Sequence, residues 1–251
     1  MAPKAGLLGL QAETALAFDA YIGEAEAQMQ ALLQEGAFLW SDAALERISS
    51  REKGEIPVQL WAGNSPVPVP HGLIHDWVGG VFVLAATMEK TLALFQDYDN
   101  HKNIYRPEVV DSKLLGRCGD DFQAYLRLLK KKIVTVVLDT YHEAHYSRLD
   151  RYRACCSSRS TRIQEVQDAG KAGEKLLAPD TGHGFLWRLY SYWKFRERED
   201  GTVIECRAIS LTRDIPAALK LIVQPMVRSL PRDSLVRTLA ATRQALAERA
   251  G

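Results

Sequence analysis

The segment from Phe185 to Leu239 constrains the fold most, because its side chains alternate as in two strands and then follow a helical pattern. On the first strand, a largely apolar set alternates with a largely polar set. The apolar set is Phe185, Trp187, Leu189, Ser191, Trp193 and Phe195, and the polar set is Arg188, Tyr190, Tyr192, Lys194 and Arg196. This alternation predicts a half-buried antiparallel strand whose polar face lies in water.

A second strand, Thr202 to Ser210, follows the turn that Glu199-Asp200-Gly201 predicts. The side of this strand marked by Glu205 and Arg207 is expected in water. The other side carries smaller residues, namely Ile204, Cys206 and Ala208. Small residues beside the bulky aromatics of the first strand suit a sheet that curves around a cavity. The molecule that fills such a cavity would then determine the function, and the residues do not name it.

The composition of the 251-residue chain is that of an ordinary globular protein, with 47% hydrophobic and 25% charged residues. The formal net charge of +1 gives no electrostatic argument for a nucleic-acid partner. No apolar run approaches the roughly 18–20 residues that span a bilayer, so no transmembrane segment is predicted. The apolar patch from Ala5 to Leu10 is shorter than the core of a secretory signal. We therefore expect a cytoplasmic protein, or an exported one whose signal has been trimmed.

No cofactor, metal or catalytic residue is predicted. None of the four cysteines lies in a CxxC motif. His142 and His145 are three positions apart on a predicted strand, so their side chains point to opposite faces and cannot bind one ion. Gly79-Gly80 lacks the spacing of a phosphate-binding loop, and no nucleophile accompanies a histidine as in a catalytic triad.

The chain divides into three predicted parts: a helical extension over residues 1–55, a proline-rich link over 56–70, and one domain over 71–251. In the extension, residues 12–34 are good helix formers. The apolar stripe of that helix includes Leu16, Ala20, Ala27 and Ala31.

Within residues 71–251 the pattern predicts several strands and a closing helix. The strands are expected at 73–84, 109–117, 122–129, 134–147, 152–166, 185–196 and 202–210. A bulge or bend is expected at Gly79-Gly80, and a helix is expected after Thr87. The final helix, residues 216–251, should be divided by Pro225 and Pro231, because an interior proline removes a backbone hydrogen bond. Its apolar stripe is Leu235, Leu239, Thr242 and Leu246.

This order of elements resembles the helix-grip fold of the START and polyketide-cyclase-like (SRPBCC) superfamily. The resemblance covers about residues 71–249 and is carried by GLIHDWVGGVFV, ATMEKTLALFQDYDNHKNIYRPEVV, FLWRLYSYWKF, VIECRAISLTRDIP and SLPRDSLVRTLAATRQAL. It implies an α+β fold in which a long C-terminal helix closes a curved antiparallel sheet over a deep pocket. In that superfamily the pocket takes sterols, phospholipids, polyketides or other apolar ligands. The helical extension lies outside the resemblance, and a packing extension, a lid and a partner surface are the alternatives for it.

The resemblance places the ligand between the sheet and the final helix, among apolar and small polar side chains. The candidate pocket residues are Leu126, Leu128, Tyr152, Cys156, Ser158, Trp187, Leu189, Trp193, Ile204, Ala208, Met226, Val227, Leu235 and Leu239. The face that Tyr152, Cys156 and Ser158 share is small and polar, so its hydroxyl groups could bind a polar end of the ligand. The alternatives are that this face lies in solvent and that the aromatic set is simply core.

The function favoured by these observations is non-catalytic binding, and transport, of a lipid-like or other apolar small molecule. The alternative is a cyclase- or hydrolase-type enzyme, which needs a buried acid or histidine at the pocket; Glu205, Asp139 and His142 are the strand candidates. A third interpretation is an interaction module whose pocket has collapsed. Arg127 and the run Lys130-Lys131-Lys132 are expected at a solvated hairpin end, or else on a patch that makes transient contact with anionic lipid.

Overall fold

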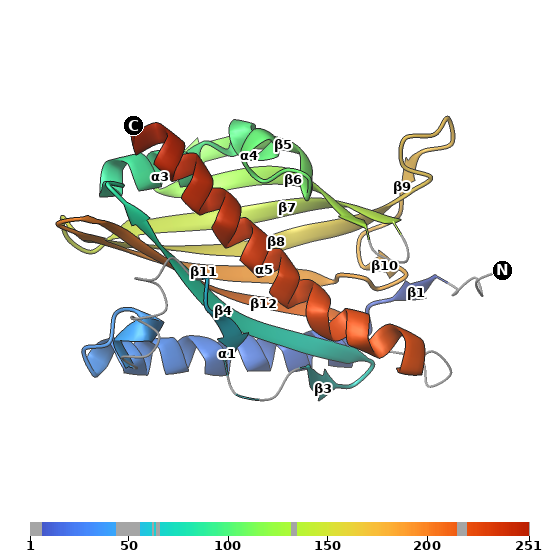
Figure 1. The fold of residues 1–251 in the computed structure, drawn as a ribbon. Coiled ribbons are helices and arrows are strands. Elements are labelled where there is room, and N and C mark those ends of the chain that lie inside the picture. The colour runs from blue at the N-terminus through green and yellow to red at the C-terminus, as the bar shows by residue number, and fades with distance from the viewer. Residues whose placement is uncertain are drawn as a thin grey trace.

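The computed structural model describes residues 7–43, 56–61, 63, 66–131, 135–214 and 220–250, with side chains for residues 229–249 of the last segment. Within these residues, ten strands form one antiparallel sheet that lies between two long helices (Figure 1). The main strand order is β2 (Val58–Leu60), β4 (Gly72–Leu84), β12 (Gly201–Arg213), β11 (Arg188–Arg198), β8 (Arg153–Gln167), β7 (Thr135–Arg148), β6 (Asp121–Lys131) and β5 (Val109–Cys118). The short strands β3 (Val67–Val69) and β9 (Lys175–Leu176) pair with β4 and β8.

The long strands occupy the segments that alternation predicted, although β11 begins at Arg188 rather than Phe185. Gly201 starts β12 with φ +155°, and a Cβ there would lie 2.2 Å from the carbonyl oxygen of Val83, so this hairpin needs a glycine. The bulge predicted at Gly79-Gly80 is wrong, because β4 pairs with β12 without a register shift. Gly79 instead leaves room for the close approach of β2 and of Leu239.

The helices are α1 (Ala12–Gln34), α3 (Met88–Gln96), α4 (His101–Ile104) and α5 (Lys220–Ala250), with 3-10 turns η1 (Trp40–Ala43) and η2 (Tyr98–Asn100). Two further short strands, β1 (Leu8–Gly9) and β10 (Thr181–Gly182), pair with each other.

As predicted, α3 begins after Thr87, whose hydroxyl accepts a hydrogen bond from the backbone N–H of Lys90. The predicted division of the last helix is wrong, since α5 continues through Pro225 and Pro231; a proline can kink a helix without ending it. Among the described helices, none combines the length and apolar character needed to cross a membrane.

The inner face of the sheet is the face that α5 crosses (Figure 1). Buried aromatic residues gather where α3 and η2 pack on this face. Phe95 belongs to α3 and Tyr98 to η2, and Phe122, Tyr146 and Phe195 belong to the sheet. Phe95 makes edge-to-face contacts with Trp193 and Phe195, at centroid distances of 4.7 and 4.8 Å. The stripe Leu235, Leu239 and Leu246 of α5 is buried in the same cluster. The prediction that a C-terminal helix closes an antiparallel sheet is therefore confirmed.

The outer face of β4 and β12 is covered by α1 and not by water. Phe18 and Ile22 of α1 pack against Ile74, Ile209 and Leu211 of the sheet. Four of these five side chains are 0% exposed, and Ile22 is 6% exposed. Alternation reports that two faces differ in polarity, and it does not distinguish a face in water from a face whose polar groups meet another element.

The polar side chains of β11 bind the segment that follows α1. The Lys194 ammonium donates a hydrogen bond to the carbonyl oxygen of Phe38 at 2.7 Å. Arg196 donates two hydrogen bonds of 2.7 Å to the carboxylate of Asp42. The expectation that this polar set lies in water is therefore wrong, because charge-assisted hydrogen bonds replace the solvent.

A buried ion pair fixes α1 to the sheet. Arg207 of β12 and Asp76 of β4 are each 3% exposed and join through Nε–Oδ1 at 3.0 Å and Nη2–Oδ2 at 2.6 Å. Arg207 also donates to the carbonyl oxygen of Ala25 in α1 at 3.2 Å, and the hydroxyl of Tyr21 donates to Asp76 at 2.8 Å. The ring of Trp61 lies 3.9 Å from the guanidinium group. Arg207 was expected in water, and it is instead the centre of the contact between helix and sheet.

The buried side of α1 also differs from the predicted stripe. Its buried residues are Thr14, Phe18, Ile22, Ala25 and Met29. Leu16, expected on the apolar stripe, is 69% exposed. The large apolar residues at positions 18 and 22 orient the helix more strongly than the alanines from which the stripe was inferred. β2 and β3, from the segment expected to be a link, pair with β4; the three-part division of the chain stays a prediction.

Candidate functional site

A row of mostly small side chains crosses the inner face beneath α5. Trp77 of β4 pairs with Ala208 of β12, Ala208 with Ser191 of β11, and Ser191 with Ser158 of β8. We name these four residues the inner rung. Each of them is only partly buried, although they lie on strands of the face that α5 crosses (Figure 1). This partial exposure on a face that a helix covers makes the inner rung the candidate border of a space beneath α5.

α5 is attached toward both edges of the curved sheet. On the β4 side, Leu239 packs over Gly79, where an added Cβ would lie 3.1 Å from its Cδ1 atom. On the β5 side, the Ser234 hydroxyl donates to Glu108 at 2.9 Å, and Arg237 pairs with the same carboxylate at 2.5 Å. The central strands β11 and β8 lie between these attachments, so the inner rung faces the span of the helix.

A second, more polar row lies next to the inner rung. His75 pairs with Ser210, and Ser210 pairs with Leu189. The backbone N–H of Leu189 donates to the hydroxyl of Ser160 at 3.0 Å, and Ser160 pairs with His142. We name these five residues the polar rung. Its four polar members are at most 7% exposed.

Two buried polar atoms on β4 have no hydrogen-bond partner within the described part of the chain: Nδ1 of His75 and Nε1 of Trp77. Nε2 of His75 lies 3.1 Å from the hydroxyl of Thr212, and that hydroxyl donates to the carbonyl oxygen of Arg213 at 3.2 Å. Because the hydroxyl proton is directed to that carbonyl, we assign the proton of the His75 ring to Nε2, as the donor to Thr212. Its Nδ1 is then an acceptor with a free lone pair, whereas Nε1–H of Trp77 is a donor.

The two histidines of the polar rung are neutral at neutral pH. Burial lowers the pKa of His75 and of His142 to about 4. Nε2 of His142 lies 3.0 Å from the hydroxyl of Thr140, which donates to the carbonyl oxygen of Leu126. His145 lies on the outer face and is exposed, so the prediction that it points away from His142 is confirmed.

Ten of the predicted pocket residues lie on the inner face or on the side of α5 that meets it. They are Leu126, Leu128, Cys156, Ser158, Leu189, Trp193, Ile204, Ala208, Leu235 and Leu239. Cys156, Ile204 and Leu239 are fully packed in the core. Trp193 and Ala208 are partly exposed at the border of that core. Contact of any of the ten with a ligand stays a prediction.

The other predicted pocket residues lie elsewhere or outside the described side chains. Trp187 packs with α1 on the outer face, so its expected place beside Leu189 is wrong. It precedes β11, and the alternation of the strand does not extend to it. Tyr152 precedes β8 and is 50% exposed, so it does not share the face of Ser158 as expected. Met226 and Val227 belong to α5, but their side chains lie outside the described residues.

His75 and Trp77 were not predicted as site residues. Both belong to an alternating set on β4, which is Leu73, His75, Trp77, Gly79, Val81 and Val83. Two polar-tipped residues within an otherwise apolar or glycine set are the local signal that could have identified them. Their place beside Ser210 and Ala208 depends on the pairing of β4 with β12, which lies far along the chain.

Of the three residues considered for catalysis, His142 alone lies on the inner face. Glu205 lies on the outer face and accepts hydrogen bonds from two backbone N–H groups of η1, at 2.6 and 3.2 Å. Asp139 also lies on the outer face, where it accepts bonds of 2.7 and 2.9 Å from Arg127 and one of 2.9 Å from the hydroxyl of Tyr125. Both carboxylates serve structural contacts on the side of the sheet opposite α5.

Two members of the predicted basic group are paired within the chain. Arg127 binds Asp139, and Lys130 contacts Glu108 and Ser234. Lys132 lies outside the described residues. These pairs leave fewer free charges at this end of the sheet than the sequence suggested, and transient membrane contact stays a prediction.

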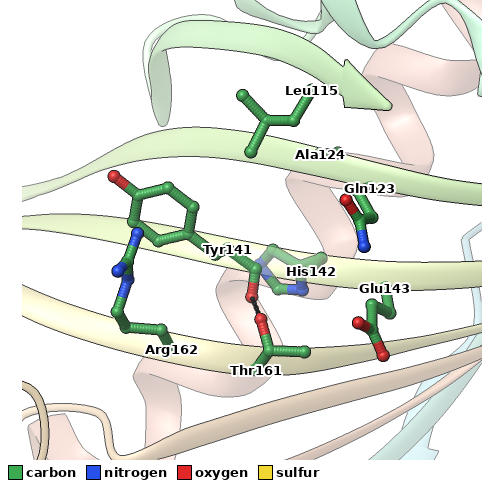
Figure 2. A pocket seen from close by; sticks show the side chains of 8 residues that line it. All are labelled: Leu115, Gln123, Ala124, Tyr141, His142, Glu143, Thr161 and Arg162. Carbon is green, nitrogen blue, oxygen red and sulfur yellow. Dashed lines mark hydrogen bonds between the residues drawn. The ribbon is translucent and has the colours of Figure 1, made fainter. Parts of the chain in front are cut away.

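An open hollow of about 380 Å³ lies on the outer face of β5 to β8, with α5 on the far side of the sheet (Figure 2). Its lining residues are Leu115, Gln123, Ala124, Tyr141, His142, Glu143, Thr161 and Arg162. The guanidinium of Arg162 lies 3.8 Å over the ring of Tyr141, and the Thr161 hydroxyl donates to the carbonyl oxygen of Tyr141 at 3.3 Å (Figure 2). The hollow lies where the pairing of β7 with β8 shifts register. No pattern in the sequence predicts this hollow.

Comparison with known proteins gives a result at the level of fold. No protein-family model matches the chain, and no curated protein matches its sequence. The Zhui aromatase/cyclase from Streptomyces sp. R1128 is 11% identical and superposes with a TM-score of 0.51, covering 71% of this chain and 96% of that chain. The STAR-related lipid transfer protein from Xanthomonas axonopodis is 16% identical with a TM-score of 0.43, covering 73% of this chain and 96% of that fragment. Human STARD10 is 10% identical with a TM-score of 0.44, covering 81% of this chain and 80% of that chain. The first of these similarities, together with the sheet order and the closing helix, shows that the chain has the helix-grip fold.

Proposed function

We propose that this chain binds an apolar small molecule in the space between α5 and the inner face of the sheet. The observation that carries the proposal is the inner rung, whose four residues are partly exposed on strands of the face that α5 crosses. The small side chains of Ala208, Ser191 and Ser158 leave room between α5 and the inner face of the sheet. The rings of Trp77 and Trp193 would form aromatic walls of this space. Pockets for small molecules commonly combine such apolar walls with a few polar groups.

The ligand's apolar body would lie over the inner rung, with its polar end toward the polar rung. Each Å² of apolar ligand surface removed from water contributes about 25 cal/mol before the cost of ordering the ligand. In this proposal residues 71–251 hold the ligand. The N-terminal extension supports the sheet from the outer face, because α1 packs on the side opposite α5.

We propose binding and transport without catalysis. The inner-face histidines His75 and His142 have a pKa of about 4, so they are weak bases at neutral pH, where a general base works best with a pKa near the operating pH. The acids considered for an enzymatic role, Glu205 and Asp139, are bound on the outer face. These two observations favour a binding protein over a cyclase or hydrolase.

Variants that fill the inner rung test the proposal. Ala208→Leu and Ser158→Leu should abolish the fluorescence increase of Nile red that the unmodified protein produces, because the added methyl groups occupy the space of the dye. Ala20→Leu is the matched control, since Ala20 is exposed on the solvent side of α1. Native mass spectrometry of the unmodified protein should show a co-purified apolar molecule. Undiminished dye binding by both filled variants, with no co-purified molecule, would refute the proposal.

A further inference from the structure

A buried acceptor and a buried donor belong to residues two positions apart on the inner face of β4. His75 and Trp77 occupy alternate positions of this strand, so their side chains leave the same face about 6.6 Å apart. Nδ1 of His75 and Nε1 of Trp77 are both buried and have no partner among the described residues. Buried polar groups in folded proteins are nearly always hydrogen-bonded. Two unsatisfied atoms at adjacent inner-face positions therefore indicate a group that the ligand brings.

Building on the proposed function, we infer that the ligand carries a hydroxyl group that accepts a hydrogen bond from Nε1–H of Trp77 and donates one to Nδ1 of His75. A hydroxyl is both a donor and an acceptor, so one such group satisfies both atoms. A ketone, an ether or a carboxylate only accepts, and each would leave Nδ1 of His75 unpaired. An ammonium only donates, and it would leave Nε1–H of Trp77 unpaired.

The surroundings of the pair favour a neutral ligand. The neighbouring inner-face residues described in the structure carry no charge; they are Leu73, Leu189, Ala208, Ser210 and Thr212. His75 itself is kept uncharged by burial, with a pKa of about 4. An anionic head group would have no cation among these residues, and taking it out of water would be costly. The inferred ligand is thus an apolar alcohol or phenol.

A matched series of ring compounds tests the inference by isothermal titration calorimetry. Naphthalene reports the apolar cavity alone, and 2-naphthol and 2-methoxynaphthalene differ in whether the oxygen can donate a hydrogen bond. We expect 2-naphthol to bind about tenfold more tightly than 2-methoxynaphthalene, and 2-naphthoate to bind no more tightly than naphthalene. The affinity of decahydro-2-naphthol relative to decahydronaphthalene measures the preference for the hydroxyl group of an aliphatic alcohol. Comparing this preference with that for 2-naphthol distinguishes a sterol-like ligand from a phenolic one.

Two variants remove the partners one at a time. Trp77→Phe keeps an aromatic ring and removes the donor, and His75→Leu removes the acceptor. His75→Leu should reduce the preference for 2-naphthol over 2-methoxynaphthalene to less than about threefold, because the acceptor for the hydroxyl proton is gone. Trp77→Phe should weaken the binding of both oxygen compounds relative to naphthalene, because both accept from its N–H. Both variants should leave naphthalene binding within about twofold. Trp61→Phe is the control, because its indole N–H donates to Gln28 at 3.0 Å on the outer side of the sheet and should leave the preference unchanged.

A second measurement keeps the test decisive if a variant fails to fold. In the unmodified protein, the ¹⁵N resonance of Nδ1 of His75 should shift on addition of 2-naphthol, which donates to this atom, and not on addition of 2-methoxynaphthalene, which cannot donate. Naphthalene binding without any hydroxyl preference would overturn the inference and leave the proposed cavity intact. Failure of every probe to bind would overturn the proposed function together with the inference.

Discussion

The buried ion pair between Arg207 and Asp76 gives the sharpest test of how α1 is held to the sheet. Both side chains are 3% exposed, and the guanidinium also binds a backbone carbonyl of α1. Arg207→Met removes the positive charge and leaves the carboxylate of Asp76 buried with the Tyr21 hydroxyl as its remaining side-chain donor. Breaking a buried pair in this way costs about 3–5 kcal/mol, because the remaining charge loses its compensation.

A double-mutant cycle separates the pair from the packing of its side chains. Asp76→Leu combined with Arg207→Met leaves no buried charge, and such replacements are often close to neutral. The double variant still leaves the Tyr21 hydroxyl without its acceptor, at a cost of about 1–3 kcal/mol, so the triple variant with Tyr21→Phe should recover most of the stability.

Urea denaturation followed by circular dichroism measures the free energy of unfolding of each variant. Lys171→Met is the matched control, because Lys171 pairs with Asp168 at the surface with 73% and 48% of the side chains exposed. An exposed pair of this kind contributes less than about 1 kcal/mol. If Arg207→Met cost no more than Lys171→Met, the burial argument for this contact would be refuted.

Three further predictions follow from buried groups. Leu239→Ala should lower the free energy of unfolding by about 2–5 kcal/mol in urea denaturation, because this side chain is 0% exposed under α5, whereas Leu16→Ala should change it by less than about 0.5 kcal/mol. Burial lowers the pKa of His75, His101 and His142 to about 4, so the unfolded state binds more protons between about pH 6.5 and 4. Stability should therefore fall on acidification through that window by about 1.4 kcal/mol per pH unit per histidine, and an unchanged slope in His142→Gln would contradict the assignment. Glu205→Gln should cost about 1–3 kcal/mol and accelerate amide exchange at Trp40 and Ser41, whose N–H groups it binds; unchanged exchange would show that other contacts hold η1.

The long strands and the closing helix could be predicted because their signals are local. Period-two alternation marks the segments of β4, β6, β7 and β8 within a few residues, and the spacing of Leu235, Leu239 and Leu246 marks the buried side of α5. Both signals arise from neighbours in the sequence that share one face of an element. The family resemblance then implied that the long C-terminal helix closes a curved antiparallel sheet.

The covering of the outer face could not be predicted from the same signals. Arg207 and Glu205 alternate with apolar residues as exposed residues would. The partner of Arg207 is Asp76, and the partners of Glu205 are N–H groups of η1; both lie far away in the sequence. A buried charge with a distant partner has no local signature that separates it from a charge in water. The aromatic residues Tyr190 and Tyr192 in the polar set were the available hint, since tyrosine commonly packs its ring and hydrogen-bonds its hydroxyl.

The candidate site was predicted in part for a related reason. Trp193 and Ala208 were predicted from the apolar and small sets of their strands, and Ser158 was predicted from a small, polar set; all three lie on the inner face. His75 and Trp77 lie on the same face, but their importance rests on hydrogen bonds that are missing. A donor or acceptor can be identified as unpaired once the positions of all surrounding donors and acceptors are known. No pattern along the chain gives these positions.

The distribution of packing between the two faces explains how the sheet would tolerate the space that we propose beneath α5. On the outer face, Phe18, Ile74, Ile209 and Leu211 are fully buried, and each such side chain contributes about 1.5–3 kcal/mol. On the inner face, dense packing is confined to the aromatic cluster near α3 and to the stripe of α5. Since the net stability of a domain is only about 5–15 kcal/mol, the contribution of the outer cluster is comparable to the whole. The helix that covers the outer face can therefore stabilise the central strands, and this leaves the inner rung available for the ligand that we propose.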